Sequence, residues 1–290
     1  MRDERAVQEF WQEHACGDAQ VGGLREHFEG DYDQFFTAYD QFRYRTERHL
    51  PACLDALPVT DADVLEIGIG EGSDSERMIR RGARWSGVDL TAESVDRVRT
   101  RLTRRSLPFV VLHQGSVVNL PFPDDSFDLV FSHGVLHHVP DIELAQKEIH
   151  RVLRPGGELV IMVYARRSLN YMVSISLIRR AALLAAYPLG RAGLLKRGAT
   201  PALLTSHLAN AEATGLRRYL RLQEFIHHNT DGPENPYSKV YDARRIAQDF
   251  SSFSVTRTYK RFMHAPPLPV HRLPGGSVAG WHLWAHLRPL

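Results

Sequence analysis

The chain has 290 residues and a formal net charge of +2, with 36 basic against 34 acidic side chains. This length allows one large domain, or one domain with a sizeable appendage. The balanced charge gives no overall case for a nucleic-acid or membrane partner. The two cysteines, Cys16 and Cys53, cannot build a disulfide framework or a metal cluster, so reduced thiols and a cytoplasmic setting are expected. The first residues, Met-Arg-Asp-Glu-Arg, contain no apolar signal region.

Residues 1–58 are predicted to form helices that precede the main domain as an N-terminal cap. Apolar spacing indicates helices over 6–14 and 32–57, with glycines between them. The second helix is rich in aromatic and arginine side chains, among them Tyr44, a candidate substrate contact. Two interpretations stay open, namely an amphipathic helix packed on the core and a lid over a bound ligand.

Residues 64–73 predict a short buried strand, a glycine turn and the start of a helix. The run Val64–Ile67 is β-branched, apolar and too short for a helix. Glycines follow at alternate positions, Gly68, Gly70 and Gly72, which permits a tight turn and a close approach of ligand to backbone. Ser73 is predicted to cap the next helix, with Glu76 completing a capping box. The free N–H groups of that helix would then face the ligand.

The charges around this turn favour a cationic ligand over a diphosphate. Ser73 stands where a dinucleotide-binding G-x-G-x-x-G turn has its third glycine, and Glu71 lies inside the turn. Glu66 adds a second carboxylate, and two carboxylates would repel a pyrophosphate. S-adenosylmethionine (SAM) has an ammonium and a sulfonium group and no phosphate. Asp89, which ends the next strand, is placed to accept hydrogen bonds from ribose hydroxyls.

Residues 59–166 alternate strands with helices, which predicts parallel strands covered by helices on both faces. The expected strands are 64–67, 84–88, 109–113, 127–132 and 158–164, and the expected helices are 74–81, 92–105 and 142–153. Asp141 is predicted to cap the last helix, and Gly156-Gly157 to end it. Ligands of such sheets bind at the carboxyl ends of the strands, where Glu66, Asp89, Ser116 and His133 fall.

Five segments in this order resemble the motifs of class I SAM-dependent methyltransferases of the type 11 group, which includes ubiquinone/menaquinone-biosynthesis methyltransferases. They are Glu66-x-Gly68-x-Gly70-x-Gly72, Gly87-Val88-Asp89-Leu90, Asn119-Leu120-Pro121-Phe122 with Ser126–Val130, Gly134–His138 and Leu153–Gly157. The resemblance covers roughly residues 60–166. It implies a Rossmann-like α/β sheet of seven mostly parallel strands with the last antiparallel, and SAM as cofactor. The cofactor-binding residues that it implies are Glu66, Gly68, Gly70, Gly72, Asp89, Leu90, Ser116, Val117 and His133.

One position departs from the family pattern. After the third strand the family usually has an acidic residue that bonds the adenine amine, whereas this chain has Ser116. A hydroxyl can still accept from the amine, and the Val117 N–H can still donate to the ring, but the contact should be weaker. The alternative is that Ser116 is only a turn residue and apolar walls hold the adenine.

Residues 167–245 are predicted to form a helical insert after the fifth strand, as a substrate pocket or lid. The apolar run 169–187 is split by Arg179-Arg180 into pieces too short to span a membrane. The segment from Arg166 to Arg221 contains ten basic residues and a single acidic one, Glu212. This pattern fits a solvated helix face, or else a surface for an anionic substrate or a membrane.

The segment 227–241 is dense in polar side chains and constrained by Gly and Pro, which favours a functional loop. His228 and Tyr237 are its candidate substrate contacts, and the alternative is an ordered connector. Residues 246–290 are predicted to complete the sheet with an antiparallel pair, 255–263 and 281–287. Seven histidines invite a metal site, but none has tight ligand spacing, so no metal is expected: His133, His137, His138, His227, His228, His264 and His271.

The predicted reaction is methyl transfer to a small-molecule acceptor by in-line displacement, with O, N and C acceptors all open. Secondary-metabolite, lipid and quinone-like acceptors fit, including anionic ones. His133 and His137 are the general-base candidates, with cofactor-wall and packing roles as alternatives. Tyr164 and Asn170 follow the fifth strand and are further candidates for the reaction and for substrate binding.

Two other functions are compatible with a fold of this kind. A SAM-binding cyclase or regulatory module uses the same fold, and an NAD-dependent oxidoreductase uses a similar sheet. Nucleic acid is not expected as a partner, because Ser132-His133-Gly134-Val135 replaces the N-P-P-Y type of tetrapeptide. No integral membrane segment is expected, and a homodimer is left open.

Overall fold

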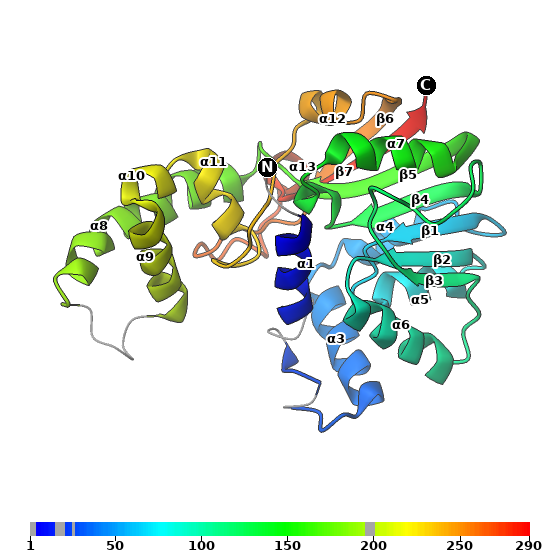
Figure 1. The fold of residues 1–290 in the computed structure, drawn as a ribbon, viewed down its shortest axis with the longest axis horizontal. Helices are drawn as coiled ribbons and strands as arrows, with labels where there is room; N and C mark the ends of the chain where they lie inside the picture. Colours follow the sequence, from blue (N-terminus) through cyan, green and yellow to red (C-terminus); the bar gives the residue numbers. More distant parts are fainter. Residues whose placement is uncertain (1–3, 15–20, 25–26, 195–200) are drawn as a thin grey trace.

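A computed structural model describes residues 4–14, 21–24, 27–194 and 201–290, so Cys16, Lys196 and Arg197 lie outside the described residues. Its centre is a seven-stranded sheet in the order β3-β2-β1-β4-β5-β7-β6 (Figure 1). The strands are β1 (Asp63–Ile67), β2 (Arg84–Asp89), β3 (Val111–Gln114), β4 (Phe127–His133), β5 (Leu153–Tyr164), β6 (Phe253–Arg261) and β7 (His282–Pro289). Strands β1 to β5 pair in parallel, and β7 is antiparallel to β5 and β6. The expected Rossmann-like fold is confirmed.

Helices cover both faces of the sheet, as the alternation of elements predicted. They are α4 (Leu50–Asp55), α5 (Ser73–Arg80) and α6 (Ala92–Arg104) on one face, and α7 (Ile142–Val152) and α12 (Ala243–Asp249) on the other. Neighbouring strand residues alternate between two cores: Val64 packs with Trp85 on the α4–α6 face, whereas Leu65 packs with Ile149 on the α7 face. This burial on both faces explains the continuous apolar runs Leu129–Phe131 in β4 and Leu159–Val163 in β5.

The boundary between α7 and β5 differs from the prediction. Asp141 caps α7 as expected, with its carboxylate accepting from the Leu144 N–H at 3.1 Å. The helix then ends at Val152, and Leu153 already pairs with Phe127 of β4. The prediction that Gly156-Gly157 ends the helix is therefore wrong, because pairing with β4 draws the chain into the sheet earlier than the glycines do.

Among its described residues, the N-terminal region forms the helices α1 (Glu4–Glu13), α3 (Tyr32–Thr46) and α4. The single helix predicted over 32–57 is instead two helices, α3 and α4. Pro51 lies in the first turn of α4. Proline removes a backbone donor and is tolerated at a helix start rather than in its interior, which accounts for the break. Helix α1 lies apart from α3 and α4, beside the carboxyl ends of the strands (Figure 1).

The insert forms a lobe that projects from the sheet, at the left of Figure 1. Its elements are η2 (Asn170–Arg179), α8 (Arg180–Arg191), α9 (Ala202–Thr214), α10 (Leu216–Tyr219), α11 (Leu222–Phe225) and η3 (His227–Asn229). The Arg179-Arg180 pair does not split the apolar run as predicted, because η2 and α8 join into one helix, Asn170–Arg191. That helix is long and apolar enough to cross a membrane by length and composition, a test that the core helix of a water-soluble protein also passes. A short helix, α13 (Gly276–Ala279), precedes β7.

Candidate functional site

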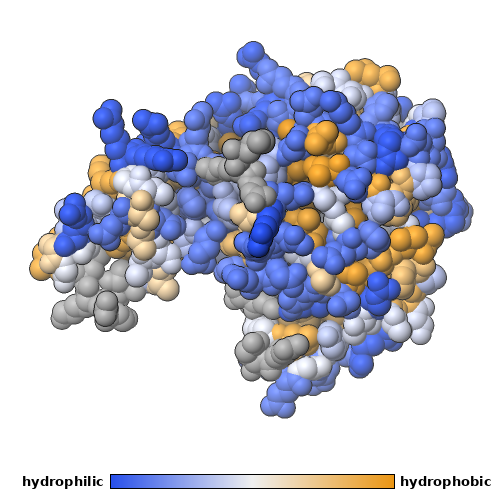
Figure 2. All heavy atoms as spheres, in the orientation of Figure 1, coloured by the Kyte–Doolittle hydropathy of each residue, from blue (hydrophilic) through white to orange (hydrophobic). Residues whose placement is uncertain are grey.

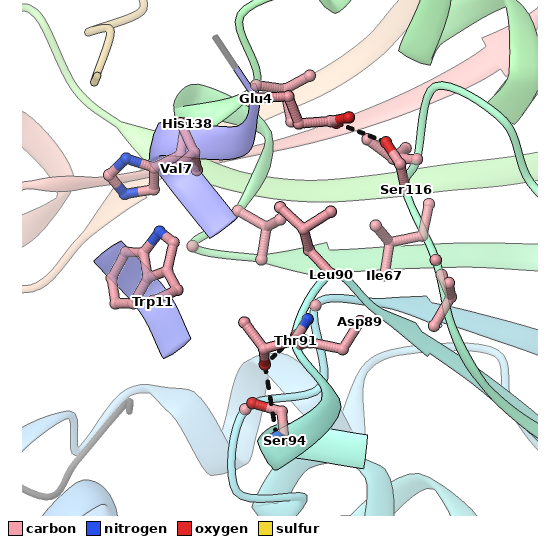
Figure 3. A pocket seen from close by; sticks show the side chains of 18 of the residues that line it. Glu4, Val7, Trp11, Ile67, Asp89, Leu90, Thr91, Ser94, Ser116 and His138 are labelled. Atoms are coloured by element: carbon pink, nitrogen blue, oxygen red, sulfur yellow. Dashed lines mark hydrogen bonds between the residues drawn. The ribbon is translucent and has the colours of Figure 1, made fainter. Parts of the chain in front are cut away.

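A cavity with about 880 Å³ of empty space opens at the carboxyl ends of β1, β2 and β4 (Figure 3). Its floor includes Gly68, Gly70, Asp89 and Leu90, and its sides include Ser116, Val117 and His133. Three side chains of α1 close it from outside: Glu4, Val7 and Trp11. The helix 32–57 was one predicted lid over a bound ligand, but the helix that covers the cavity is the shorter α1.

The glycine turn lies against the cavity in a conformation that needs glycine. Gly68, Gly70 and Gly72 all have positive φ angles, of +76°, +50° and +78°. A Cβ on Gly68 would stand 2.1 Å from Cγ2 of Val135, which leaves no room for another residue. The turn therefore brings bare backbone to the cavity wall, as the glycine spacing predicted.

The predicted capping box is wrong. Gly72 is the N-cap of α5 and Ser73 is its first residue, so the Ser73 hydroxyl is free for other bonds. It donates to Asp40 at 2.5 Å, while Glu76 accepts from Arg101 at 2.9 Å. A hydrogen bond to α3 and an ion pair with α6 thus engage the two side chains that the local sequence would assign to the cap.

The two carboxylates expected to face a cationic ligand are already occupied. Glu71 accepts from Nη1 of Arg97 at 2.8 Å, and both side chains are buried. Glu66 accepts from the Ser75 hydroxyl at 2.6 Å and from the Trp85 indole at 2.9 Å. Burial, helped by the charge of Asp74, raises the pKa of Glu66 to about 8. The argument that these two charges select the ligand is therefore corrected, and Glu66 lies behind the turn rather than among the residues lining the cavity.

Asp89 lies where the sequence placed it, at the end of β2 and in the cavity wall. Its carboxylate accepts from the Thr91 N–H and hydroxyl and from the Ile69 N–H, at 2.8–3.0 Å. Burial raises the pKa of Asp89, and these hydrogen bonds oppose the rise. These bonds fix the Asp89 carboxylate in the cavity wall, next to the glycine turn.

Ser116 has a partner that sequence spacing could not suggest. Its hydroxyl donates to Oε1 of Glu4 at 2.5 Å, so helix α1 brings a carboxylate to the wall where the family pattern lacks one (Figure 3). The amide of Gln8, one turn along α1, donates to the Leu90 carbonyl at 3.0 Å. These two bonds hold α1 across the cavity between the ends of β2 and β3.

His133 reaches the cavity from the end of β4 with a defined tautomer. Nη2 of Arg43 lies 3.2 Å from its Nδ1, and the same guanidinium pairs with Asp74 at 2.7 Å. Because arginine only donates, Nδ1 of His133 must accept, and the proton of the neutral ring is on Nε2. Burial and the charge of Arg43 hold the pKa of His133 well below its ordinary value. In this arrangement His133 is a donor at Nε2 rather than a base.

A second group of polar side chains is buried beside the cavity. Tyr164 donates to Oδ1 of Asp231 at 2.6 Å, and Nε2 of His138 lies 3.2 Å from the other oxygen of Asp231. The Tyr164 ring stacks on Trp281, and its centroid is 3.9 Å from that of His137. Burial would raise the pKa of Asp231, but His138, His137 and Tyr164 together hold it at about 2.

His137 and His138 are adjacent in sequence but face different surroundings. Nδ1 of His138 is 2.7 Å from the Tyr237 carbonyl, and its ring lines the cavity. His137 is fully buried, and neither of its ring nitrogens has a partner among the described residues. Burial and the neighbouring His138 hold the pKa of His137 well below its ordinary value, so this ring is neutral and keeps one nitrogen able to accept a proton.

The predicted substrate contacts are dispersed. The Tyr44 hydroxyl donates to the Ser73 carbonyl at 3.1 Å, which ties α3 to α5. Asn170 is buried at the start of η2, and His228 lines a different cavity beside the insert. Tyr237 reaches the site through its backbone carbonyl, and its ring stacks on His227. None of these four side chains lines the cavity under α1.

Several site residues escaped the sequence interpretation. Glu4, Arg43 and Asp231 come from segments far from the motifs. The only signal for them in the sequence is that each is a charged residue in the predicted N-terminal cap or in the predicted polar loop. The structure also brings two sets of three possible metal ligands within 4.8 Å of one another. They are Glu47, His133 and His282, and His137, His138 and Asp231. Sequence spacing predicted no metal, and spacing is blind to ligands assembled from separate segments.

Comparison with known proteins identifies the part of the chain around the cavity. Residues 65–161 match the family described as "Methyltransferase domain". An uncharacterized methyltransferase of Mycobacterium bovis is 32% identical over 123 residues, which is 42% of this chain and 61% of that protein. A fatty-acid O-methyltransferase of Mycolicibacterium smegmatis is 38% identical over 96 residues, covering 32% of this chain and 34% of that protein. The matched part thus spans less than two thirds of either relative's length.

A solved structure shows the same fold. The SAM-dependent methyltransferase of Methanosarcina mazei aligns with a TM-score of 0.53 and 16% identity, covering 83% of this chain and 97% of that one. The cavity fits the cofactor of this class, because it combines bare turn backbone, the Asp89 carboxylate and the Glu4–Ser116 pair. Residues 65–161 of this chain therefore match the methyltransferase domain family of type 11, and the sheet that contains them has the fold of SAM-dependent methyltransferases.

Proposed function

We propose that the protein is a cytoplasmic enzyme that transfers a methyl group from SAM to a small-molecule acceptor. The observation that carries the proposal is the position of the buried polar group around Asp231 directly beside the cavity that fits the cofactor, since His138 belongs to both. Natural-product, lipid and quinone-like acceptors fit this description better than nucleic acid. The acceptor atom is an oxygen, nitrogen or carbon.

Bound SAM supplies an activated methyl group, so the protein has to align the acceptor, exclude water and, for hydroxyl or carbon acceptors, remove a proton. Gly68 and Gly70 present backbone to the cofactor, and Asp89 and Leu90 lie at its nucleoside part. Helix α1 excludes water with Val7 and Trp11. Glu66 and Gly72 act indirectly, by holding the turn and the start of α5 in place.

Two histidines divide the acid–base work in this proposal. His133 donates from Nε2 toward the reacting groups, because Arg43 occupies its Nδ1. His137 is the base in this proposal, because its ring lies against Tyr164, with centroids 3.9 Å apart, and has a ring nitrogen without a partner among the described residues. Tyr164, fixed by Asp231, orients the acceptor. A carboxylate acceptor has no proton to lose, so it would need to be oriented by Tyr164 but would not need a base.

Calorimetry with SAM and with NAD tests the cofactor half of the proposal, and release of S-adenosylhomocysteine with hydroxyl, carboxylate and amine acceptors tests the transfer. We expect saturable binding of SAM alone, and turnover with one acceptor class. Saturable binding of NAD without binding of SAM would sink the proposal. Binding of SAM without product from any acceptor would favour the non-methylating alternative, a cyclase or regulatory module.

His137→Phe isolates the base. This variant should bind SAM as the wild type does and lose at least about 100-fold in kcat with a hydroxyl acceptor, since general base catalysis contributes roughly that much or more. His150→Phe is a control, because His150 lies on α7 away from the cavity. Unchanged turnover in His137→Phe would exclude His137 as the base while leaving the cofactor site intact.

A further inference from the structure

A second cavity, with about 1140 Å³ of empty space, lies between the insert and the loops that follow η3 and β6. Its walls are mostly apolar, with Leu183 from α8, Leu204 from α9 and Phe225 from α11. Arg179 and the rings of His207, His228 and His264 provide most of its polar character. Small-molecule sites have this make-up of apolar walls with a few convergent polar groups.

Arg179 is a partly buried cation without a carboxylate partner among the described residues. Its Nη1 donates to the Asn229 carbonyl at 2.9 Å and its Nε to the Pro266 carbonyl at 3.2 Å. Burial lowers its pKa to about 10, and no acidic group offsets that effect. A buried charge is costly unless it is paired, and two neutral carbonyls do not neutralise it. The cavity therefore carries an uncompensated positive charge.

The backbone that presents Arg179 is itself unusual. Residues Asn170–Arg179 form a π-helix of 10 residues, which ends at this arginine. The π-helix is rare, and short stretches of it are frequent at functional sites. The wider turn of this segment sets the position from which Arg179 meets the cavity.

The three imidazoles around Arg179 cannot balance its positive charge, because a histidine ring is either neutral or positively charged. Burial lowers the pKa of both His207 and His264 to about 4, so these rings are neutral near pH 7. Nδ1 of His207 lies 2.7 Å from the Tyr219 hydroxyl, and Nδ1 of His228 lies 2.7 Å from the Pro233 carbonyl. Nε2 of His228 is 3.9 Å from Oε1 of Glu224. The site thus offers the Arg179 cation and the neutral rings of His207 and His264 among apolar walls.

We propose that this cavity binds an amphipathic anion, meaning a carboxylate or phosphate carried on an apolar chain. Arg179 is the counter-ion, since its planar guanidinium matches either group, and Leu183, Leu204 and Phe225 receive the chain. The exposed side chain of Leu203 lies at the edge of the cavity and extends this apolar surface to solvent.

The cavity is next to the proposed reaction site, which links it to the acceptor. Thr230 and Gly232 line it, and the carboxylate of Asp231 between them points the other way, to Tyr164 and His138. The inference rests on the proposed methyltransferase function in this respect: the bound anion is a part of the acceptor distant from the atom that receives the methyl group.

Titration calorimetry with laurate, dodecyl phosphate and dodecanol, each below its aggregation concentration, tests the site. We expect the wild type to bind one or both anions, and Arg179→Gln to weaken that binding at least tenfold while changing dodecanol binding less than twofold. Arg179→Lys should recover part of the loss. Arg191→Gln is the matched control, because Arg191 ends the same long helix and is exposed.

Equal losses for dodecanol and laurate in Arg179→Gln would overturn the proposal, as would a wild type that binds SAM but none of the three amphiphiles. If Arg179→Gln fails to fold, Leu204→Trp tests the same cavity by filling it, and it should abolish binding of laurate. SAM calorimetry on every variant separates the two proposals, since loss of the anion site leaves SAM binding within about twofold.

Discussion

The sheet domain and the insert differ in the partners of their buried or partly buried arginines, which are carboxylates in the first and backbone carbonyls in the second. Arg101 of α6 is 1% exposed, and its guanidinium bonds Asp40 and Glu76. Arg97, also on α6, pairs with Glu71 behind the glycine turn. Arg179 of the insert lies against two carbonyls instead. Charges that the protein itself balances hold a scaffold together, whereas the unbalanced Arg179 is the counter-ion in the anion site proposed above.

The two regions also differ in how they treat apolar side chains. Val130, Leu159 and Ile161 in the sheet are completely buried. On the insert, Leu177, Leu184 and Leu189 are 62%, 55% and 45% exposed, and Figure 2 shows orange and pale side chains among blue ones on this lobe, with further orange patches over the main body. The central strands bury their apolar side chains, whereas the long helix of the insert exposes several of its own, as expected of a part that meets an apolar ligand.

The largest effect should come from breaking a balanced buried charge. Arg101→Gln leaves Asp40 and Glu76 buried without their central partner, and we expect a loss of about 3–5 kcal/mol in unfolding free energy. Arg179→Gln removes a charge that nothing balances, so its unfolding free energy should stay within about 1 kcal/mol of the wild type. Urea denaturation compares the two, and similar losses would contradict the contrast between the regions.

The glycine turn gives the next effect, of about 3 kcal/mol. Gly68→Ala combines a left-handed backbone with a Cβ 2.1 Å from Val135, so it should lower both stability and SAM affinity. Gly156→Ala is the control, because Gly156 has a similar φ of +82° and open space around its Cβ. It should cost about 1 kcal/mol and leave SAM binding unchanged. Thermal unfolding with and without SAM distinguishes a clash from backbone strain.

His264 predicts a pH dependence that belongs to the insert cavity. Its pKa is about 4, held down by burial and by Arg179, with Asp231 opposing. The unfolded chain takes up this proton near the ordinary pKa of about 6.5, so stability is full above that pH and falls as pH drops toward 4. The slope from this ring is at most about 1.4 kcal/mol per pH unit.

His264→Phe should therefore flatten the fall in unfolding free energy between pH 6.5 and 5, measured by urea denaturation at several pH values. The control is His271→Gln, which removes an exposed imidazole and should leave the slope as in the wild type. A His264→Phe curve parallel to that of the wild type would rule out a neutral, buried imidazole at this position.

Glu4 gives the smallest of these effects, on cofactor affinity alone. Glu4→Gln removes the charged acceptor at Ser116, and we expect SAM to bind about tenfold more weakly, or about 1.4 kcal/mol. Ser116→Asp introduced into that variant should restore affinity by returning a carboxylate to the same wall. Glu9→Gln is the control, because Glu9 is on α1 and pairs only at the surface with Arg5. Failure of the second change to rescue binding would show that Glu4 acts by fastening α1.

The fold was predictable because its signals are local. The β-branched run at Val64–Ile67, the glycines after it and the Asp141 cap each act within a few residues, and the repeated strand–helix alternation determines a parallel sheet. The carboxyl ends of parallel strands meet at one edge, so the positions of Asp89, Ser116 and His133 at the cavity also followed from the sequence.

What the chain's sequence determined by itself was therefore the sheet, the glycine turn and the strand ends that line the cavity. Tertiary structure decided which polar groups are free: it paired Glu71 with Arg97, gave Ser73 a hydrogen bond to Asp40 and Glu76 an ion pair with Arg101, and set Glu4 against Ser116, 112 positions away. Strands and caps depend on short-range periodicity, whereas the pairing of a charge depends on which distant segment folds against it. For the same reason only the structure could show Asp231 beside Tyr164 and Arg179 without a counter-ion among the described residues.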